Sequence, residues 1–193
     1  MSEAPLFEAR RWYEEAVAAS LPEPEAMALA TASPDGMPSV RIVLLKGIDD
    51  RGLQFFTNYG SRKGRELDAN PRAAVTLYWQ PLHRAVRAEG AVERLTEEES
   101  DAYFASRGRG SQLGAWASKQ GTPIPDRSAL EAAFAEADEH YPGEDVPRPD
   151  YWGGYRLVPS AVELWQGRPN RLHDRTHWVR EPGGGWRTER LSP

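Results

Sequence analysis

Three arginines and two histidines surround a single acid near the C-terminal end of the chain, in the stretch GRPNRLHDRTHW at 167–178. The stretch follows an apolar run, AVELW at 161–165, which is typical of a β-strand. A solvated turn between two strands can hold such charges, but a site for an anion or a charged cofactor explains them equally well. The residues with chemistry to offer here are Arg171, His173 and Arg175, and the rest of the sequence must decide.

Two further basic islands lie at 61–65 (SRKGR) and 106–111 (SRGRGS). The net charge of the chain is -5, which argues against a general nucleic-acid or membrane-surface binder. We therefore expect the islands to be discrete sites for small anions, with solvated loop charges as the alternative. In the first island a helix is predicted to begin after Ser61, which places Arg62 and Lys63 at a helix N-terminus, where free N–H groups favour a phosphate.

The second island follows a predicted helix with a capping box, so that three polar side chains recur at four-residue steps. On a helix Tyr103 and Arg107 share a face, and a glycine-rich break then brings Ser111 round to them. Two hydroxyl groups and a guanidinium can coordinate a phosphate monoester. The alternative is an ordinary helix end with an exposed arginine.

The segment RIVLLK at 41–46 is predicted to be a strand with one cation at each end. Side chains on a strand alternate between its two faces, and a buried cation without a partner is costly. The terminal cations should therefore meet acids, ligand anions or solvent. One face carries Arg41, Val43 and Leu45, and the other carries Ile42, Leu44 and Lys46.

Composition restricts the class of protein further. The 193 residues include no cysteine, which excludes disulfides and thiolate chemistry and fits a cytosolic location. The four histidines form no HExxH motif, and no metal is predicted. The N-terminus has no apolar run long enough for a signal peptide or a membrane span. We expect one domain over 1–193, with a helix or arm at 1–25.

Short strands separated by turn signals dominate the rest of the chain. No βαβ alternation and no GxGxxG after a strand are present, which disfavours a dinucleotide-binding fold. The pattern predicts a mainly β (α+β) fold, an antiparallel barrel with peripheral helices. Strands are expected at 26–32, 39–47, 53–58, 73–79, 84–95, 153–167, 176–181 and 185–191, and helices at 5–19, 61–71, 96–107 and 126–141.

Taken together and in order, several motifs resemble the pyridoxine/pyridoxamine 5'-phosphate oxidase family. They are RIVLLKG, FFTNYGSRKGREL, YFASRGRGSQLGAWASKQ, YWGGYRL, VELWQGRPNRLHDR and the terminal W…RLSP. The resemblance implies an FMN-binding split β-barrel with a Greek-key-like arrangement. It also implies a homodimer with two sites at the subunit interface. Such an enzyme oxidises pyridoxamine or pyridoxine 5'-phosphate with O2 to pyridoxal 5'-phosphate and hydrogen peroxide.

The resemblance assigns residues to two ligands. The FMN side comprises the strand residues Arg41, Ile42, Val43, Leu44, Leu45 and Lys46, then Phe56 and Thr57, Arg62 and Lys63 on the phosphate, and Gln120, the backbone of Gly121, Trp165 and Arg175 from the other subunit. The residues implied to bind the substrate phosphate are Lys46, Tyr103, Arg107 and Ser111. Arg171 and His173 are implied to be catalytic and to hold the pyridine ring with its C4' carbon against flavin N5. We expect Arg171, His173 and Arg175 to share one face of an extended segment, with Leu172 and Asp174 turned away.

Three departures from the family pattern concern the flavin. Ala85 stands where a flavin-contacting glutamine is usual, Gly121 where a serine is usual, and Phe56 where a tyrosine is frequent. Whether His173 removes a proton or only hydrogen-bonds the substrate stays open. Two rival functions also stay open: a related flavin oxidase of the phenazine type acting on another aromatic substrate, and a non-catalytic flavin- or haem-binding protein of the same fold.

Overall fold

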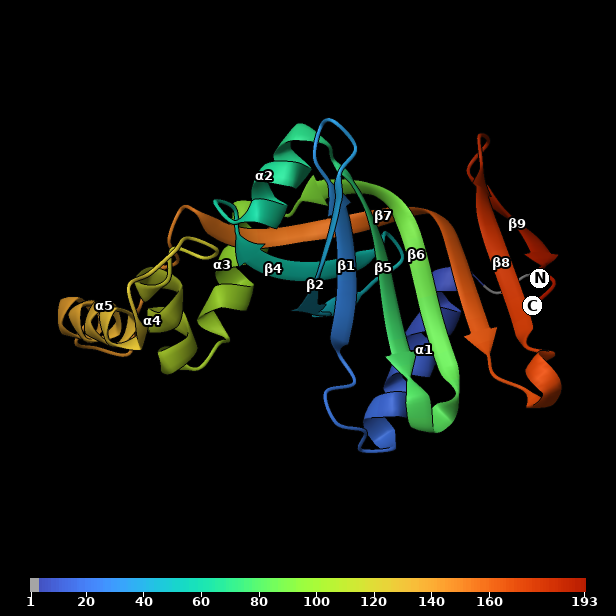
Figure 1. Ribbon diagram of the computed structural model, residues 1–193, viewed down its shortest axis with the longest axis horizontal. Helices are drawn as coiled ribbons and strands as arrows, with labels where there is room; N and C mark the ends of the chain where they lie inside the picture. Colours follow the sequence, from blue (N-terminus) through green and yellow to red (C-terminus); the bar gives the residue numbers. More distant parts are fainter. Residues whose placement is uncertain (1–3) are drawn as a thin grey trace.

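Nine β-strands share a single, largely antiparallel sheet in the computed structural model, which describes residues 4–193 (Figure 1). Apolar and polar residues alternate along most of them, which is the pattern of a sheet with one buried face. The strands are β1 (Ala26–Ala32), β2 (Pro38–Leu44), β3 (Gly47–Ile48), β4 (Leu53–Asn58), β5 (Arg72–Trp79), β6 (Arg84–Arg94), β7 (Trp152–Gln166), β8 (Asp174–Glu181) and β9 (Gly185–Arg190).

The order of the strands makes the sheet curl. Its main path runs β2-β1-β5-β6-β7-β4-β3, with β8 and β9 branching from β7. Strands β2 and β3 lie at opposite ends of this path, yet only Leu45 and Lys46 separate them in the chain. The two ends of the path are therefore held close together, and the predicted antiparallel barrel with peripheral helices is confirmed.

Strand β7 is the central element of the sheet, because its 15 residues pair with β6 along one edge and with two different strands along the other. Its first half pairs with β4, from Trp152 opposite Asn58 to Leu157 opposite Leu53. Its last residues, from Ala161 to Gln166, pair with β8 instead. One continuous strand thus joins the barrel to the C-terminal hairpin that carries the opening motif of the sequence.

Five helices of the described residues lie outside the sheet (Figure 1). The capping residues predicted from the sequence are confirmed: Ser61 and Asp126 accept from backbone N–H groups three residues on, and Thr96 forms a full capping box with Glu99. No helix within residues 4–193 is both long and apolar enough to cross a bilayer. The helices are α1 (Pro5–Ala18), α2 (Arg62–Ala69), α3 (Glu97–Ala105), α4 (Arg109–Ala117) and α5 (Arg127–His140).

Helices α3, α4 and α5 gather at one end of the molecule around their own apolar cluster (Figure 1). Phe104, Leu113 and Trp152 are its largest buried members. Helix α4 was not predicted, and α3 ends at Ala105. Arg107 therefore lies in the link between two helices, and the expectation that it shares a helical face with Tyr103 is wrong.

A buried cation fixes α3 to the barrel. The Arg156 side chain on β7 is 2% exposed, and its Nη2 donates to Glu99 at 3.0 Å and to Asp49 at 3.1 Å. Its Nη1 donates to Glu93 at 3.3 Å. Because Glu99 also caps α3, this ion-pair network sets the position of the helix that carries Tyr103.

Candidate active site

Lys63, at the start of α2, is a buried cation held by neutral oxygens. Its side chain is folded inward, and Nζ donates to Gln120 Oε1 at 2.8 Å, to Thr57 Oγ1 at 3.1 Å and to Ser61 Oγ at 3.3 Å. Burial, and then the nearby charge of Arg41, lower the pKa of Lys63 to about 8. No carboxylate of the described residues forms an ion pair with this ammonium, so the site is suited to an external anion.

Arg41 and Arg62 lie beside Lys63, and we call these three residues the α2 cation cluster. The clustering is visible in the pKa of Arg41, which burial lowers and which the charge of Arg62 lowers further, against the influence of Glu66. Arg41 Nη1 donates to Thr31 Oγ1 at 2.6 Å and to the carbonyl oxygen of Leu29 at 3.1 Å. Both arginines also contact the carboxylate of Glu66, a residue that the sequence analysis did not single out.

The predicted strand ends earlier than expected, because β2 stops at Leu44, but the alternation continues through Lys46. Arg41 and Val43 are half-buried and Leu45 is buried, whereas the residues between them are exposed. The exposed residues include Ile42, which is 64% exposed, and Lys46 in the link to β3. An exposed apolar stripe therefore runs along β2.

A cavity of about 300 Å3 lies between the barrel and α4. Arg107, Ser111, Gln120 and Trp152 are among its lining residues. The guanidinium of Arg107 stacks over the Trp152 ring, 4.6 Å from its centroid, and its Nη1 is buried without a hydrogen-bond partner in the described part of the chain. Burial lowers the pKa of Arg107, but an arginine stays protonated, so this cavity holds an uncompensated positive charge.

Tyr103 and Phe56 form one wall next to this cavity. Their rings stack with centroids 3.9 Å apart, and the Trp152 ring stacks with both of them. The structure therefore brings Tyr103, Arg107 and Ser111 into one region, as predicted for a phosphate clamp. Gln120 joins this region to the α2 cation cluster, because it lines the cavity and also accepts from Lys63.

The opening motif forms a turn before it forms a strand. A short 3-10 helix at Pro169–Arg171 contains Asn170 at φ 59° and Arg171 at φ 61°, both in the left-handed region. Strand β8 begins only at Asp174. The prediction that Arg171, His173 and Arg175 share a face of an extended segment is therefore wrong, because the turn rotates Arg171 away from the strand. Such backbone conformations in non-glycine residues are often found at functional sites.

His173 contacts the backbone of Arg168 and the aromatic ring of Trp165. The backbone N–H of Arg168 donates to His173 Nδ1 at 3.1 Å, and the imidazole lies 4.6 Å from the Trp165 ring. The Arg168 side chain donates to Asp174 Oδ2 at 2.7 Å and so closes the turn. Because Nδ1 accepts a hydrogen bond, a neutral His173 carries its proton on Nε2.

Arg175 lies opposite Trp165 in the pairing of β7 and β8 and is anchored within its own chain. It donates to both carboxylate oxygens of Glu163, at 2.8 and 3.0 Å, and Arg87 donates to the same group at 2.7 Å. Burial raises the pKa of Glu163, but these two arginines outweigh it and hold the pKa below the usual range. Arg175 is thus fixed in place beside Trp165 and His173.

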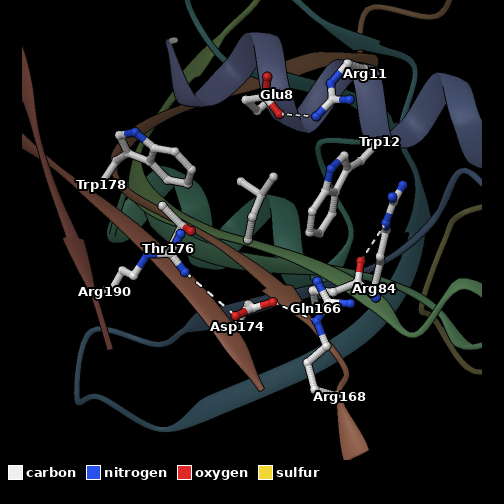
Figure 2. A pocket seen from close by; sticks show the side chains of 11 residues that line it. Glu8, Arg11, Trp12, Arg84, Gln166, Arg168, Asp174, Thr176, Trp178 and Arg190 are labelled. Carbon is white, nitrogen blue, oxygen red and sulfur yellow. Dashed lines mark hydrogen bonds and ion pairs between the residues drawn. The ribbon is translucent and has the colours of Figure 1, made fainter. Parts of the chain in front are cut away.

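A second cavity, of about 470 Å3, lies between α1 and the C-terminal hairpin (Figure 2). Its guanidinium groups face acids of the same chain. Arg11 contacts Glu8 at 2.6 Å, and Arg168 and Arg190 approach Asp174 from two sides, at 2.7 and 3.7 Å (Figure 2). The charges of this cavity are thus largely compensated, unlike those around Lys63 and Arg107, and its acid Asp174 anchors the turn that holds Arg171 and His173.

The two groups of residues that were predicted to bind the substrate lie at opposite ends of the molecule. Helices α3 and α4, which flank Arg107, form one end of the long axis, and the turn before β8 lies at the other (Figure 1). One chain therefore does not bring Arg107 and Arg171 together. The prediction for Gln120 is corrected as well. This residue was expected to act from a second subunit, but it forms hydrogen bonds with Thr57 and Lys63 of its own chain.

Each of the three departures from the family pattern, at residues predicted to lie near the flavin, has a structural feature that accompanies it. Gly121 has φ +83°, a conformation that strains any residue with a Cβ, which explains a glycine here. Ala85 pairs with Trp165 in the sheet, so its small side chain leaves that tryptophan ring free of a bulky neighbour on β6. Phe56 uses its ring for the stack with Tyr103.

Comparison with protein families gives two matches along this chain. Residues 13–141 match the family model described as "Pyridoxamine 5'-phosphate oxidase". Residues 152–193 match the model described as "Pyridoxine 5'-phosphate oxidase C-terminal dimerisation region". The first ends with α5, and the second begins with β7 and includes the opening motif.

Individual relatives agree with these matches. The pyridoxine/pyridoxamine 5'-phosphate oxidases of Cupriavidus taiwanensis and Rubrobacter xylanophilus are each 59% identical over 189 residues, which cover 98% of this chain and 89% and 87% of theirs. The solved structure of PhzG from Burkholderia lata with tetrahydrophenazine-1-carboxylic acid superposes with a TM-score of 0.92 at 38% identity, covering 98% of this chain and 92% of that one. An FMN-binding protein of Nostoc punctiforme, with a TM-score of 0.79 at 19% identity and full coverage of both chains, shares the fold.

Proposed function

The chain belongs to the pyridoxamine 5'-phosphate oxidase family, and from this premise we propose that it oxidises pyridoxine or pyridoxamine 5'-phosphate with O2 to pyridoxal 5'-phosphate and hydrogen peroxide. With the amine substrate the reaction also consumes water and releases ammonia. One observation carries the proposal. Two cations, Lys63 and Arg107, have no carboxylate partner among residues 4–193, and Gln120 links them because it accepts from the first and lines the cavity of the second. Two neighbouring phosphate sites are what a flavin nucleotide and a phosphorylated substrate require.

FMN is the cofactor that these residues fit. The buried ammonium of Lys63, with Arg62 and Arg41 beside it, would hold the phosphate at the N-terminus of α2. The segment from Arg41 to Lys46, with Phe56 and Thr57, would line the flavin together with Gln120 and the backbone of Gly121. A second copy of the chain would contribute its Trp165 and Arg175.

The residues that would bind the substrate are also divided between two copies of the chain. The substrate phosphate would bind to Tyr103, Arg107 and Ser111 of one copy, with Lys46 from the adjoining strand. The pyridine ring would lie against Arg171 and His173 of the second copy, since the turn before β8 that carries them lies at the far end of the first (Figure 1). The uncompensated charge of Arg107 supplies binding energy away from the reacting carbon, where it can position the substrate.

When bound, the flavin supplies the hydride acceptor and passes the electrons to O2. The chain supplies orientation and protonation. The hydrogen bond from the Arg168 backbone to Nδ1 makes His173 a donor through Nε2, so we propose that it hydrogen-bonds the substrate rather than removing a proton. A base is not needed for hydride to leave a carbon that bears an amine or a hydroxyl group, because the cation that forms can afterwards release its proton to water. The guanidinium of Arg171 would hold the ring flat against the flavin.

A homodimer follows from the same premise, because the C-terminal match is described as a dimerisation region. The exposed apolar stripe of β2, with Val40 at 70% and Ile42 at 64% exposure, offers a surface that a second copy can cover. We also propose a single domain over 1–193 with an arm at 1–25, since one sheet takes strands from residues 26 to 190. The cytosolic location inferred from the cysteine-free sequence stays a prediction.

A phenazine-type oxidase is the second candidate, supported by the TM-score of 0.92 to PhzG. Its identity of 38% is well below the 59% to the curated pyridoxine/pyridoxamine 5'-phosphate oxidases. The retained cluster of Tyr103, Arg107 and Ser111 favours a phosphorylated substrate. A non-catalytic carrier is disfavoured by the presence of both Arg171 and His173.

Aerobic turnover with added FMN tests the function. We expect the purified protein to be yellow and to form one hydrogen peroxide per pyridoxal 5'-phosphate from each phosphorylated vitamer. Unphosphorylated pyridoxamine should react poorly, because Arg107 then lacks its anion. A yellow protein that is inert toward both phosphorylated vitamers would contradict the proposal and favour a rival.

The FMN affinity is expected to fall as the pH rises above about 8. Lys63 has a pKa of about 8 in the flavin-free protein, and a bound phosphate dianion stabilises its ammonium form. Above this pH, binding must therefore take up a proton, and the Kd should rise by up to about tenfold per pH unit. Fluorescence titrations between pH 7 and 9.5 measure this slope.

Two controls isolate Lys63 in these titrations. Riboflavin has no phosphate, so its Kd should not follow the same slope, and the Lys63→Arg variant should show a flat FMN profile because arginine stays protonated. A wild-type Kd for FMN that is constant over this range would show that Lys63 does not bind the phosphate.

A further inference from the structure

One acid, Glu66, lies inside the α2 cation cluster and has no part in the function proposed above. Its side chain is 7% exposed. Oε2 accepts from Thr31 Oγ1 at 2.5 Å and from Ser39 Oγ at 2.6 Å. Arg62 Nε donates to Oε1 at 2.8 Å, and Arg41 Nη2 donates to Oε2 at 3.3 Å. The carboxylate thus connects α2 to β1 and β2, and it contacts two of the three clustered cations.

A carboxylate at this place is unexpected, because it repels the anion that the cluster would bind. It is nevertheless charged: burial raises the pKa of Glu66, but the hydrogen bonds from Ser39, Thr31 and Arg62 outweigh burial and bring the pKa to about 2. The two hydroxyl groups by themselves already connect Glu66 to β1 and β2. The two contacts to arginines therefore call for another explanation.

We propose that Glu66 is a positioning residue that orients Arg41 and Arg62 toward the phosphate of the flavin nucleotide and adjusts the charge of the site to a phosphate monoester. The inference rests on the proposed function and deepens it. Three cations and one carboxylate leave two positive charges, which match the dianion of a monoester near neutral pH. Riboflavin carries no phosphate charge, so Glu66 would act on the discrimination between FMN and riboflavin.

The Glu66→Gln variant tests the proposal through binding and not through turnover. Glutamine has nearly the same shape but only one acceptor oxygen, so it cannot accept from both the hydroxyl groups and Arg62. We expect the Kd of the flavin-free protein for FMN to rise about tenfold, as for a lost charge-assisted contact, while the Kd for riboflavin is unchanged. Fluorescence titration with both flavins measures the two constants.

Two further variants control for charge and for folding. Asp68→Asn removes one negative charge from the same helix, but Asp68 pairs with Arg94 at 2.8 Å, on an exposed part of the surface. Its FMN affinity should stay within about twofold of the wild type. Ser39→Ala keeps the carboxylate and removes one of its donors, so a rise of about threefold in the FMN Kd is expected even if Glu66→Gln fails to fold.

The outcomes distinguish a failure of the role of Glu66 from a failure of the proposed function. An FMN Kd that is unchanged or lower in Glu66→Gln, or an equal loss for FMN and riboflavin, overturns the role of Glu66. If only this happens and turnover persists, the oxidase function stands. A wild-type protein that binds FMN no better than riboflavin contradicts both the role of Glu66 and the proposed cofactor.

Discussion

Replacing Arg171 by alanine is expected to lower kcat by about a hundredfold or more, with FMN occupancy unchanged. Arg171 lies in a turn that Arg168 and Asp174 close, its backbone is in the left-handed region, and it is exposed. We propose that this guanidinium holds the pyridine ring against the flavin. Misplacement of a reacting carbon by about 1 Å costs about a hundredfold in rate, so the loss should fall on kcat.

Steady-state kinetics with flavin occupancy checked by absorbance measures this effect. Arg187→Ala serves as the matched control, because Arg187 lies on β9 of the same hairpin and pairs only locally with Glu189. It should leave kcat unchanged. If Arg171→Ala keeps the wild-type kcat with full flavin occupancy, the assignment of this turn to the reacting centre is wrong.

Replacing Arg107 by methionine is expected to raise KM for the phosphorylated substrate about ten- to a hundredfold and to leave kcat nearly unchanged. The guanidinium contacts the substrate equally in the ground and transition states, so its loss removes uniform binding. A charge-assisted contact contributes about 1.5–3 kcal/mol, which corresponds to this range. Methionine retains the packing on Trp152 that alanine would remove.

A matched control is Arg127→Met on α5, whose side chain is 86% exposed and which should not change KM. The activity of Arg107→Met toward unphosphorylated pyridoxamine should equal that of the wild type, because that substrate has no phosphate to lose. A fall in kcat without a change in KM would contradict the phosphate role of Arg107.

Local signals predicted most of the fold. The strands β1 and β4 begin and end at the predicted residues, and Ser61, Thr96 and Asp126 cap their helices as expected. Alternation and capping involve residues close in sequence, so they can be read from it. Helix α4 was missed because Gly110 and Gly114 lower its intrinsic helix propensity, which tertiary packing of Leu113 overrides.

The site was predictable residue by residue but not as an arrangement. Arg62 and Lys63 of the α2 cation cluster follow from a helix start, and Glu66 follows Arg62 by four residues, a spacing that could have revealed their ion pair. The contact of Gln120 with Lys63 spans 57 positions and depends on how α4 and the following loop pack, which no local pattern shows. The same holds for the separation of Arg107 from Arg171.

The division of the substrate site between two chains can be measured in mixed dimers. Arg107→Met and Arg171→Ala chains with different tags are co-expressed, and dimers that carry both tags are isolated. Each mixed dimer then holds one site with both arginines intact, and we expect about half of the wild-type activity per dimer at a substrate concentration near the wild-type KM. A mixed dimer no more active than its two parent variants would contradict a site built from both chains.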